Sequence, residues 1–405
     1  MKILLFLMST LLCTNINANI DVKRANDVNY TLGTHLEAED FAEGLTKITN
    51  NINASNGEAI DAGADVIFEL PVCYSVADVS LFALASVALL NSLGVVDYIL
   101  FGSENGSIEE VLDIAELMQA DEYVQLYNSS FEERNCNKRI DALKRMGYSN
   151  YSEYVNQPNN MLGINYVTAL KKIHFNIVPL THKRVGQAYM DTEFEGVEGD
   201  KVFSSASAIR KCINDAWIND EDLPAKLEKC VPKTVYNWME NNWKKSFPIF
   251  SRDFWNLIKR EILISSEEKL NEIEGIDKDV AHYIKAHVDE ATEYGHFISK
   301  FVRDNVNVNP DRRLYRILTK QLKKDLDFYI ENGIIFYAKV LGMSSKAKSL
   351  MEMIEGKSCV PIIDEKSKRR ADMSMFGKKQ LANDIEADCL YRAVLQAKFC
   401  EEENK

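Results

Sequence analysis

Three short apolar runs alternate with segments of helical period in the front half of the chain, and this alternation constrains the fold most. The runs are Ala64–Leu70, Tyr98–Gly102 and Asn176–Thr181, and each ends in polar or glycine-containing residues. Between them, Val79–Leu93 and Ile108–Met118 repeat apolar residues at the spacing of one helix face. Strand–helix–strand alternation favours an α/β domain with a doubly wound parallel sheet. Ligands bind beyond the carboxyl ends of such strands, so chemistry is expected in the turns that follow these runs.

The rear half has a different character, because helical periodicity dominates it from about Ala225 onward. One strand-like run, Val360–Ile363, interrupts the helices. The segments of helical period are Glu267–Phe301, Arg312–Ile330, Met343–Ile354 and Asp384–Ala397. We therefore expect an α/β domain over residues 1–222, with residues 1–60 atypical, followed by a mostly helical domain over residues 223–405.

Charge is distributed unevenly between the two halves. The 405 residues hold 48 Lys and Arg against 61 Asp and Glu, a net charge of −13. Lys300–Lys379 holds 18 basic and 10 acidic residues, a net of +8, so the rest of the chain carries −21. A basic rear behind an acidic front indicates a module that meets polyanions, although a solvated helical face explains the charge equally well.

Cysteine and histidine spacing predicts no structural metal. None of the eight cysteines forms a C-x-x-C pair, and the six histidines form no zinc pattern. Scattered thiols in a chain of this size are typical of a reducing compartment, which favours the cytoplasm.

The amino terminus allows two interpretations. The apolar run from Ile3 to Cys13 has the length of the hydrophobic part of a signal peptide, and residues 1–19 resemble such a segment. It is too short to span a bilayer, so no membrane association is expected. A buried strand of a parallel sheet has the same pattern, and we favour the strand.

Four short segments could bind a nucleotide, although each is also compatible with an ordinary turn, a helix cap or a solvated charge run. In Phe203–Lys211, serines precede a helix whose first turns carry cations, as in phosphate sites. Leu100–Glu104 places a glycine at a strand end, where a ligand can approach the backbone. Gln157–Gly163 holds tandem asparagines, and Thr181–Arg184 places cationic or ionisable side chains beyond a strand.

These segments occur in the order and at the spacing of one family. The chain resembles the bacterial tRNA(Met) cytidine acetate ligases, members of the nucleotidyltransferase superfamily, from about Gly63 to Ala397. The matching stretches are GADVIFELPVCYSV (63–76), LFGSENG (100–106), PNNMLGINYVTAL (158–170), PLTHKRVGQAYMD (179–191), FSSASAIRK (203–211), RRLYRILTK (312–320), YAKVLGMSSKAKSL (337–350) and EADCLYRAVL (386–395).

The resemblance implies an ATP-dependent ligase with a nucleotidyltransferase-like front domain and a tRNA-binding rear domain. Such enzymes activate acetate to acetyl-adenylate and form N4-acetylcytidine at the wobble position of elongator tRNA(Met), and Mg²⁺ can accompany the ATP. Matching positions imply ATP contacts for Gly102, Asn159 (rather than its neighbour Asn160) and Arg184. The implied phosphate contacts are Ser205, Ser207 and Arg210. The candidates for tRNA contact are Arg312, Arg313, Arg316, Lys320, Lys346, Arg369 and Arg370.

One family feature is missing from the sequence. The family opens with a strand that runs into an EYNPFHNGH-like turn, whose H-x-G-H residues bind ATP. The first 60 residues here contain one histidine, His35, and no H-x-G-H. Losing such donors costs on the order of 10²–10³ in rate each. The resulting alternative is an inactive paralogue that binds nucleotide or tRNA, or the product of a gene with a disrupted 5′ end.

Overall fold

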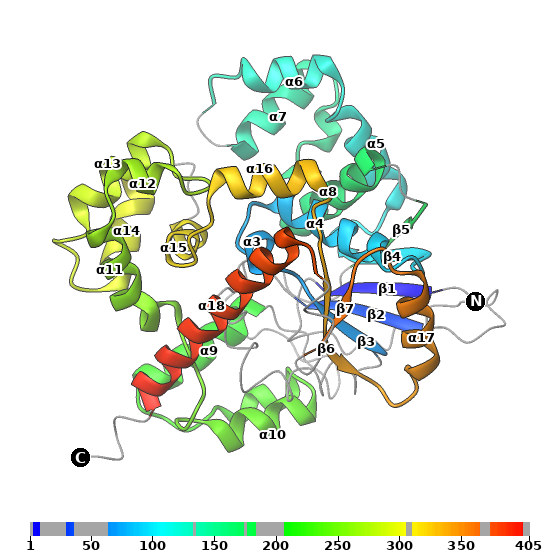
Figure 1. Ribbon diagram of the computed structural model, residues 1–405. Helices are drawn as coiled ribbons and strands as arrows, with labels where there is room; N and C mark the ends of the chain where they lie inside the picture. Colours follow the sequence, from blue (N-terminus) through cyan, green and yellow to red (C-terminus); the bar gives the residue numbers. More distant parts are fainter. Residues whose placement is uncertain are drawn as a thin grey trace.

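The computed structural model describes residues 3–8, 30–35, 64–132, 135–173, 176–183, 206–304, 310–364 and 373–399. Over these residues the protein has a mixed α/β fold that is mostly helical, with one seven-stranded sheet. Figure 1 shows the sheet on the right of the molecule and the helices of residues 255–318 on the left, whereas the helix of residues 348–357 lies beside the sheet.

The sheet has the strand order β5-β4-β1-β2-β3-β6-β7. The five strands from β5 to β3 are parallel, β6 runs antiparallel to β3, and β7 runs parallel to β6. The strands are β1 (Ile3–Met8), β2 (Tyr30–His35), β3 (Val66–Glu69), β4 (Tyr98–Ser103), β5 (Val178–Lys183), β6 (Ala338–Met343) and β7 (Ile362–Ile363). The last two come from the rear half, so the sheet joins both halves of the chain.

The helices of the front half connect the parallel strands. They are α3 (Val72–Ser75), α4 (Val79–Ser92), α5 (Ile108–Leu117), α6 (Asp121–Asn128), α7 (Asn135–Arg145), the 3₁₀ turns η1 (Ser149–Tyr151) and η2 (Tyr154–Asn156), and α8 (Pro158–Ile173). Asp78 fixes the start of α4, because its carboxylate accepts hydrogen bonds from the amides of Ser80 and Leu81.

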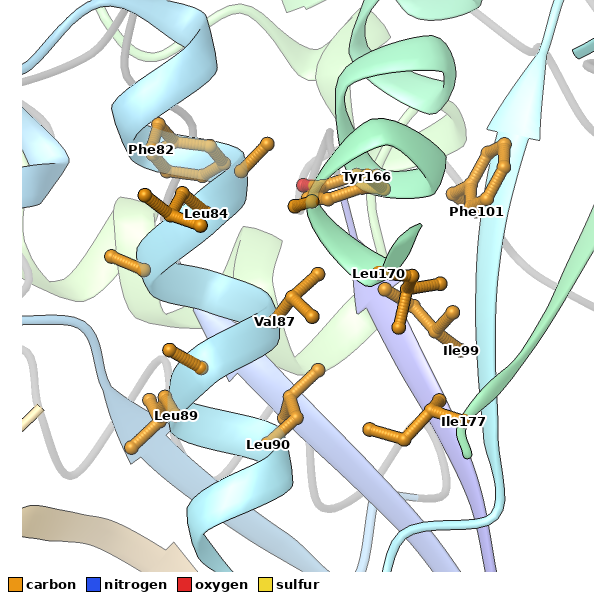
Figure 2. Close-up of a cluster of buried hydrophobic side chains, with 14 of the residues drawn as sticks. Phe82, Leu84, Val87, Leu89, Leu90, Ile99, Phe101, Tyr166, Leu170 and Ile177 are labelled. Carbon is orange, nitrogen blue, oxygen red and sulfur yellow. The ribbon is translucent and has the colours of Figure 1, made fainter. Parts of the chain in front are cut away.

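The front core forms where α4 and α8 pack against β4. Figure 2 shows Val87 and Leu90 of α4 facing Leu170 of α8 and Ile99 of β4. Contact between α8 and the strand depends on Gly163, because a Cβ atom there would lie 2.4 Å from Cε2 of Phe101. A glycine inside this helix therefore allows the close packing that places the start of α8 beside the end of β4.

The remaining helices belong to the rear half. They are α9 (Ala206–Ile218), η3 (Ala225–Lys229), α10 (Lys233–Asn242), η4 (Ser251–Phe254), α11 (Trp255–Ile264), α12 (Glu267–Asn271), α13 (Lys278–His287), α14 (Tyr294–Asp304), α15 (Pro310–Leu318), α16 (Lys323–Asn332), α17 (Lys348–Lys357) and α18 (Met375–Phe399).

Helix α18 links the hydrophobic clusters of the molecule. Its Leu381 packs with Tyr337 beside the sheet, and its Tyr391 belongs to the core of α11–α15. Near its end, the ring of Phe399 lies 6.1 Å from that of Trp217 in α9. Figure 1 shows this long helix running from the sheet toward α9 and α10.

The structure confirms the predicted strands, including the apolar run at the amino terminus, whose residues Ile3–Met8 form β1 in the middle of the sheet. Strands β2 and β6 were missed, and in β6 Lys339 interrupts the apolar pattern. One predicted helix was also misplaced, since Met343 ends β6 and the helix begins at Lys348. Of the helices in the described part of the chain, none is long and apolar enough to cross a bilayer.

Candidate nucleotide site

The carboxyl ends of the parallel strands form one edge of the sheet, which we call the ligand edge. Gly102 near the end of β4 pairs with His182 of β5, and Met8, His35 and Glu69 end β1, β2 and β3 in register with one another. Strand β1 lies between β4 and β2, which is where the strand order reverses. A crevice at such a switch point is where open α/β sheets bind ligands.

The turn after Gly102 is tied to the start of α8 by a single carboxylate. Glu104 accepts hydrogen bonds from the amide of Asn159 at 3.1 Å and from that of Asn160 at 2.7 Å. Its Oε1 also accepts from Nδ2 of Asn159 at 2.8 Å. A carboxylate satisfies the unpaired amides of a helix start and interacts favourably with the positive end of the helix.

The two asparagines at this helix start differ in how their side chains are used. Asn160 is fully buried; its Oδ1 accepts from the amide of Glu104, and its Nδ2 donates to Asn105, Tyr154 and Gln157. Its amide group therefore holds the local fold together. Asn159 is also buried, and its Nδ2 donates to Glu104, which places it beside the turn that follows Gly102. Its predicted contact with ATP stays a prediction.

Strand β5 closes the other side of the same turn. Oγ1 of Thr181 lies 3.0 Å from the carbonyl oxygen of Phe101 and 2.8 Å from Oγ of Ser103. Gly106 has a φ of +76°, and a Cβ atom there would lie 2.6 Å from Cβ of Lys183. The turn therefore needs glycine for two reasons, its backbone conformation and its close approach to β5.

The predicted phosphate residues are placed in part. Ser205 lies outside the described residues, as does Arg184, which was predicted to contact ATP. In α9, Nη2 of Arg210 lies 3.2 Å from Oγ of Ser207, so a hydroxyl and a cation meet in the first turns of this helix. Cations and hydroxyls at a helix start can bind phosphate oxygens.

The predicted tRNA contacts that the structure describes fall into two groups. Lys320 and Lys346 lie on the surface, the former in an exposed ion pair with Glu386. Arg316 is 6% exposed, and with Arg312 and Arg313 it donates to main-chain carbonyl groups. Arg369 and Arg370 lie outside the described residues.

A buried charged cluster at the end of β3 was not predicted. Lys339 of β6 lies 2.5 Å from Oε2 of Glu69, and both side chains are less than 10% exposed. Nearby, Asp384 of α18 accepts hydrogen bonds from the amide of Val72 and the hydroxyl of Tyr337. The sequence did carry a signal for this cluster, because Glu69 and Lys339 are charged residues inside otherwise apolar stretches.

Burial dominates the electrostatics of this cluster. Burial, together with the nearby Glu69 carboxylate, raises the pKa of Asp384 to about 8, so this carboxyl binds a proton at neutral pH. Burial opposes the charge of Lys339, yet Glu69 and Asp384 outweigh it and raise the pKa of the ammonium group. Among the described residues, no cluster of three or more His, Cys, Asp and Glu side chains could hold a metal ion.

Comparison with known proteins gives matches along almost the whole chain. A family model described as HIGH nucleotidyl transferase matches residues 55–405. The tRNA(Met) cytidine acetate ligase of Acetivibrio thermocellus is 31% identical over 343 residues, which are 82% of this chain and 80% of that protein. The protein of the same name from Caldanaerobacter subterraneus subsp. tengcongensis is 31% identical over 341 residues, 81% of this chain and 80% of that protein.

Solved structures match the fold. The apo crystal structure of Thermotoga maritima TmcAL superposes with a TM-score of 0.80 at 21% identity and covers 98% of this chain and 95% of its own. A second structure of that protein, bound with alpha-thio ATP, gives a TM-score of 0.78 at 20% identity with the same coverage.

Proposed function

The chain belongs to the tRNA(Met) cytidine acetate ligases of the HIGH nucleotidyltransferase family, and from this membership we propose that it acetylates a cytidine of tRNA(Met). In the first step an acetate oxygen bonds to the α-phosphorus of ATP while the bond to pyrophosphate breaks. In the second step the N4 amine of the wobble cytidine bonds to the acetyl carbon, AMP leaves, and the amine loses a proton. The reaction belongs in the cytoplasm, where ATP and tRNA are present.

The observation that carries the proposal is the position of Gly102. It lies near the carboxyl end of β4, next to β1 at the switch point, and the turn that follows it is anchored to α8 and β5. A nucleotide can approach this backbone closely because glycine has no side chain. A structure of a relative with the same fold holds an ATP analogue. We assign Asn159 and Arg184 to the same nucleotide.

The phosphates need cations, since the pyrophosphate leaving group gains charge as the bond to it breaks. We assign this role to Arg210, whose Nη2 contacts Oγ of Ser207 in α9. We expect the hydroxyl groups of Ser207 and Ser205 to bond phosphate oxygens. Mg²⁺ can accompany the nucleotide and would neutralise part of the same charge. Positioning of acetate against the α-phosphate supplies much of the remaining rate enhancement.

The rear of the chain is assigned to the RNA. We assign residues 1–222 to a doubly wound nucleotidyltransferase-like domain and residues 223–405 to a helical tRNA-binding domain that also lends β6 and β7 to the sheet. Among the described residues, Lys320 and Lys346 are the surface candidates for contact with phosphates. Arg369 and Arg370, which lie outside the described residues, are assigned the same role from the sequence. Contacts of this kind bind through charge and release of counterions, so salt weakens them.

One sequence observation supports a second candidate, an inactive binder of nucleotide or tRNA. His35 is the one histidine before His174, so residues 1–60 contain no H-x-G-H. Residues 9–29 and 36–63 lie outside the described residues. An inactive binder would retain tRNA without transferring acetate.

Acetate-dependent exchange of labelled pyrophosphate into ATP tests the first step directly. We expect exchange by the purified full-length protein and a clear loss in Asn159→Ala, which removes a side chain from the ligand edge. Asn165→Ala is the matched control, because it removes the same side chain from the same helix, where Nδ2 donates to the carbonyl group of Met161 away from the turn. Equal losses in both variants, or no exchange in any protein, would contradict the assignment.

A further inference from the structure

The segment that follows β3 is held at both ends by hydrogen bonds to side chains from the rear half of the chain. This segment, residues 69–77, contains the short helix α3 and is called the β3–α3 segment below. Oδ1 of Asp384 accepts from the amide of Val72 at 2.8 Å, at the start of α3. At the other end, Nε of Arg316 donates to the carbonyl oxygen of Val76 at 2.7 Å, and Nη1 of Arg312 donates to that of Ala77 at 3.1 Å.

The acceptor and donor groups match the unpaired main-chain groups at each end of the helix. Amides at a helix start lack acceptors, and carbonyl groups at a helix end lack donors. The carboxyl oxygen of Asp384 accepts at the first end, and guanidinium groups donate at the second, where a positive charge is also favourable. Residues more than 230 positions away in sequence therefore complete the hydrogen bonding of this helix.

Arg316 also holds a second segment. Its Nη1 donates to the carbonyl oxygen of Glu274 at 3.2 Å, between α12 and α13, and Nε of Arg313 donates to that of Gly275. Gly275 has a φ of +72°, and a Cβ atom there would lie 2.2 Å from Nη1 of Arg316. The loop therefore fits against the guanidinium group only because this position has no side chain. One arginine thus joins the ligand-edge side of the sheet to the α12–α13 loop.

This arrangement leaves Arg316 badly placed for contact with RNA. Its residue exposure is 6%, and two of its donor nitrogens are directed at main-chain carbonyl groups. Burial lowers the pKa of Arg316 to about 10, which still leaves the side chain charged at neutral pH. Lys320, two residues beyond the end of the same helix, has a side chain that is 58% exposed.

We propose that Arg316 is a positioning residue: it fixes the helices α11–α15 against the β3–α3 segment, and so sets the distance between bound RNA and the ligand edge. The effect on catalysis rests on the proposed function, whereas the role of Arg316 in joining the β3–α3 segment to the α12–α13 loop does not. Arg312 and Asp384 act on the same segment. The arginine-rich stretch 312–316 then works inside the protein, and phosphate contacts belong to exposed lysines such as Lys320.

The test compares Arg316→Gln, Arg316→Lys and the surface control Lys320→Gln in the full-length protein. Amide hydrogen exchange, followed by mass spectrometry, reports on residues 72–77 and 274–276. Retention of bulk tRNA at several salt concentrations gives the slope of affinity against salt. Acetyl transfer to tRNA gives kcat and KM separately.

For Arg316→Gln we expect exchange in both segments to rise about ten- to hundredfold, because a charged hydrogen-bond donor is lost from buried carbonyl groups. We expect the salt slope and the KM for tRNA to stay at the wild-type values while kcat falls. Arg316→Lys keeps the charge but offers one nitrogen instead of a fork, so it should protect one segment and not both. Lys320→Gln should leave exchange unchanged and lower the slope by about 0.7–0.9.

Two results would overturn the proposal. One is a rate of amide hydrogen exchange in both segments of Arg316→Gln that equals the rate in the wild-type protein. The other is a lowered salt slope in Arg316→Gln that Arg316→Lys restores, which would show a phosphate contact. Failure of the wild-type protein to retain tRNA would count against the proposed function instead. The exchange measurement would still show whether Arg316 holds the two segments.

Discussion

Replacing Lys339 by methionine should destabilise the protein severely. The ammonium group lies 2.5 Å from Glu69, and the exposures of the two side chains are 8% and 4%. Methionine fills similar space but leaves the Glu69 carboxylate buried beside Asp384 without a cation. Removing one partner of a buried ion pair costs about 3–5 kcal/mol of unfolding free energy. This is a large share of the roughly 5–15 kcal/mol by which proteins are stable.

A double-mutant cycle separates the ion pair from the general cost of mutation. Glu69→Gln combined with Lys339→Met removes both charges, so no buried charge is left uncompensated at this position. The double variant should therefore be more stable than Lys339→Met alone, with a coupling energy of about 0.5–3 kcal/mol or more. The free energy of unfolding is measured by urea denaturation at pH 7, monitored by tryptophan fluorescence.

An exposed ion pair provides the control for this measurement. Lys320 and Glu386 are 58% and 48% exposed, so Glu386→Gln should change the stability by at most about 1 kcal/mol. A cost of Lys339→Met as small as that of Glu386→Gln would show that Lys339 does not stabilise the buried Glu69 carboxylate. So would a double variant whose cost equals the sum of the two single costs.

The remaining predictions concern other groups whose surroundings the structure defines. The pKa of Asp384 is raised in the folded protein to about 8, so its protonation stabilises the fold below pH 4, and this contribution is lost as the pH rises toward and through 8. Asp384→Asn should therefore flatten the dependence of the urea midpoint on pH between pH 5 and 8. An unchanged dependence would contradict this. Gly163→Ala should cost about 1–3 kcal/mol in urea unfolding through its clash with Phe101, whereas Gly356→Ala, with open space around it in α17, should stabilise by about 0.5–1 kcal/mol; equal effects would refute the packing argument. Lys346→Gln should lower the slope of tRNA retention against salt by about 0.7–0.9, and an unchanged slope would remove this lysine from the RNA surface.

The alternating apolar runs of the front half predicted the strands well because parallel strands are buried on both faces. Ile3–Met8 could be recognised as a strand for this reason, although the same run resembles part of a signal peptide. Strand β6 escaped because Lys339 breaks its apolar pattern, and only the ion pair with Glu69 allows that lysine to be buried. Glu69 and Lys339 are 270 positions apart, so the sequence around either residue does not indicate that they pair.

The candidate site was likewise predictable only in part. Gly102 was recognisable because it ends an apolar run, and the carboxyl ends of parallel strands are where ligands bind; the structure places it beside the switch point. The arginines of the 312–316 stretch looked like surface cations in the sequence. Their contacts with the carbonyl groups of Val76, Ala77 and Gly275 depend on how α15 packs against α3 and the α12–α13 loop, which residue types alone do not specify.

The most direct test of the proposed function is transfer of labelled acetate to tRNA(Met) by the purified protein with ATP, scored as N4-acetylcytidine in the digested RNA. We expect label in acetylcytidine that depends on ATP. Retained tRNA without label would contradict the ligase assignment and support the inactive binder.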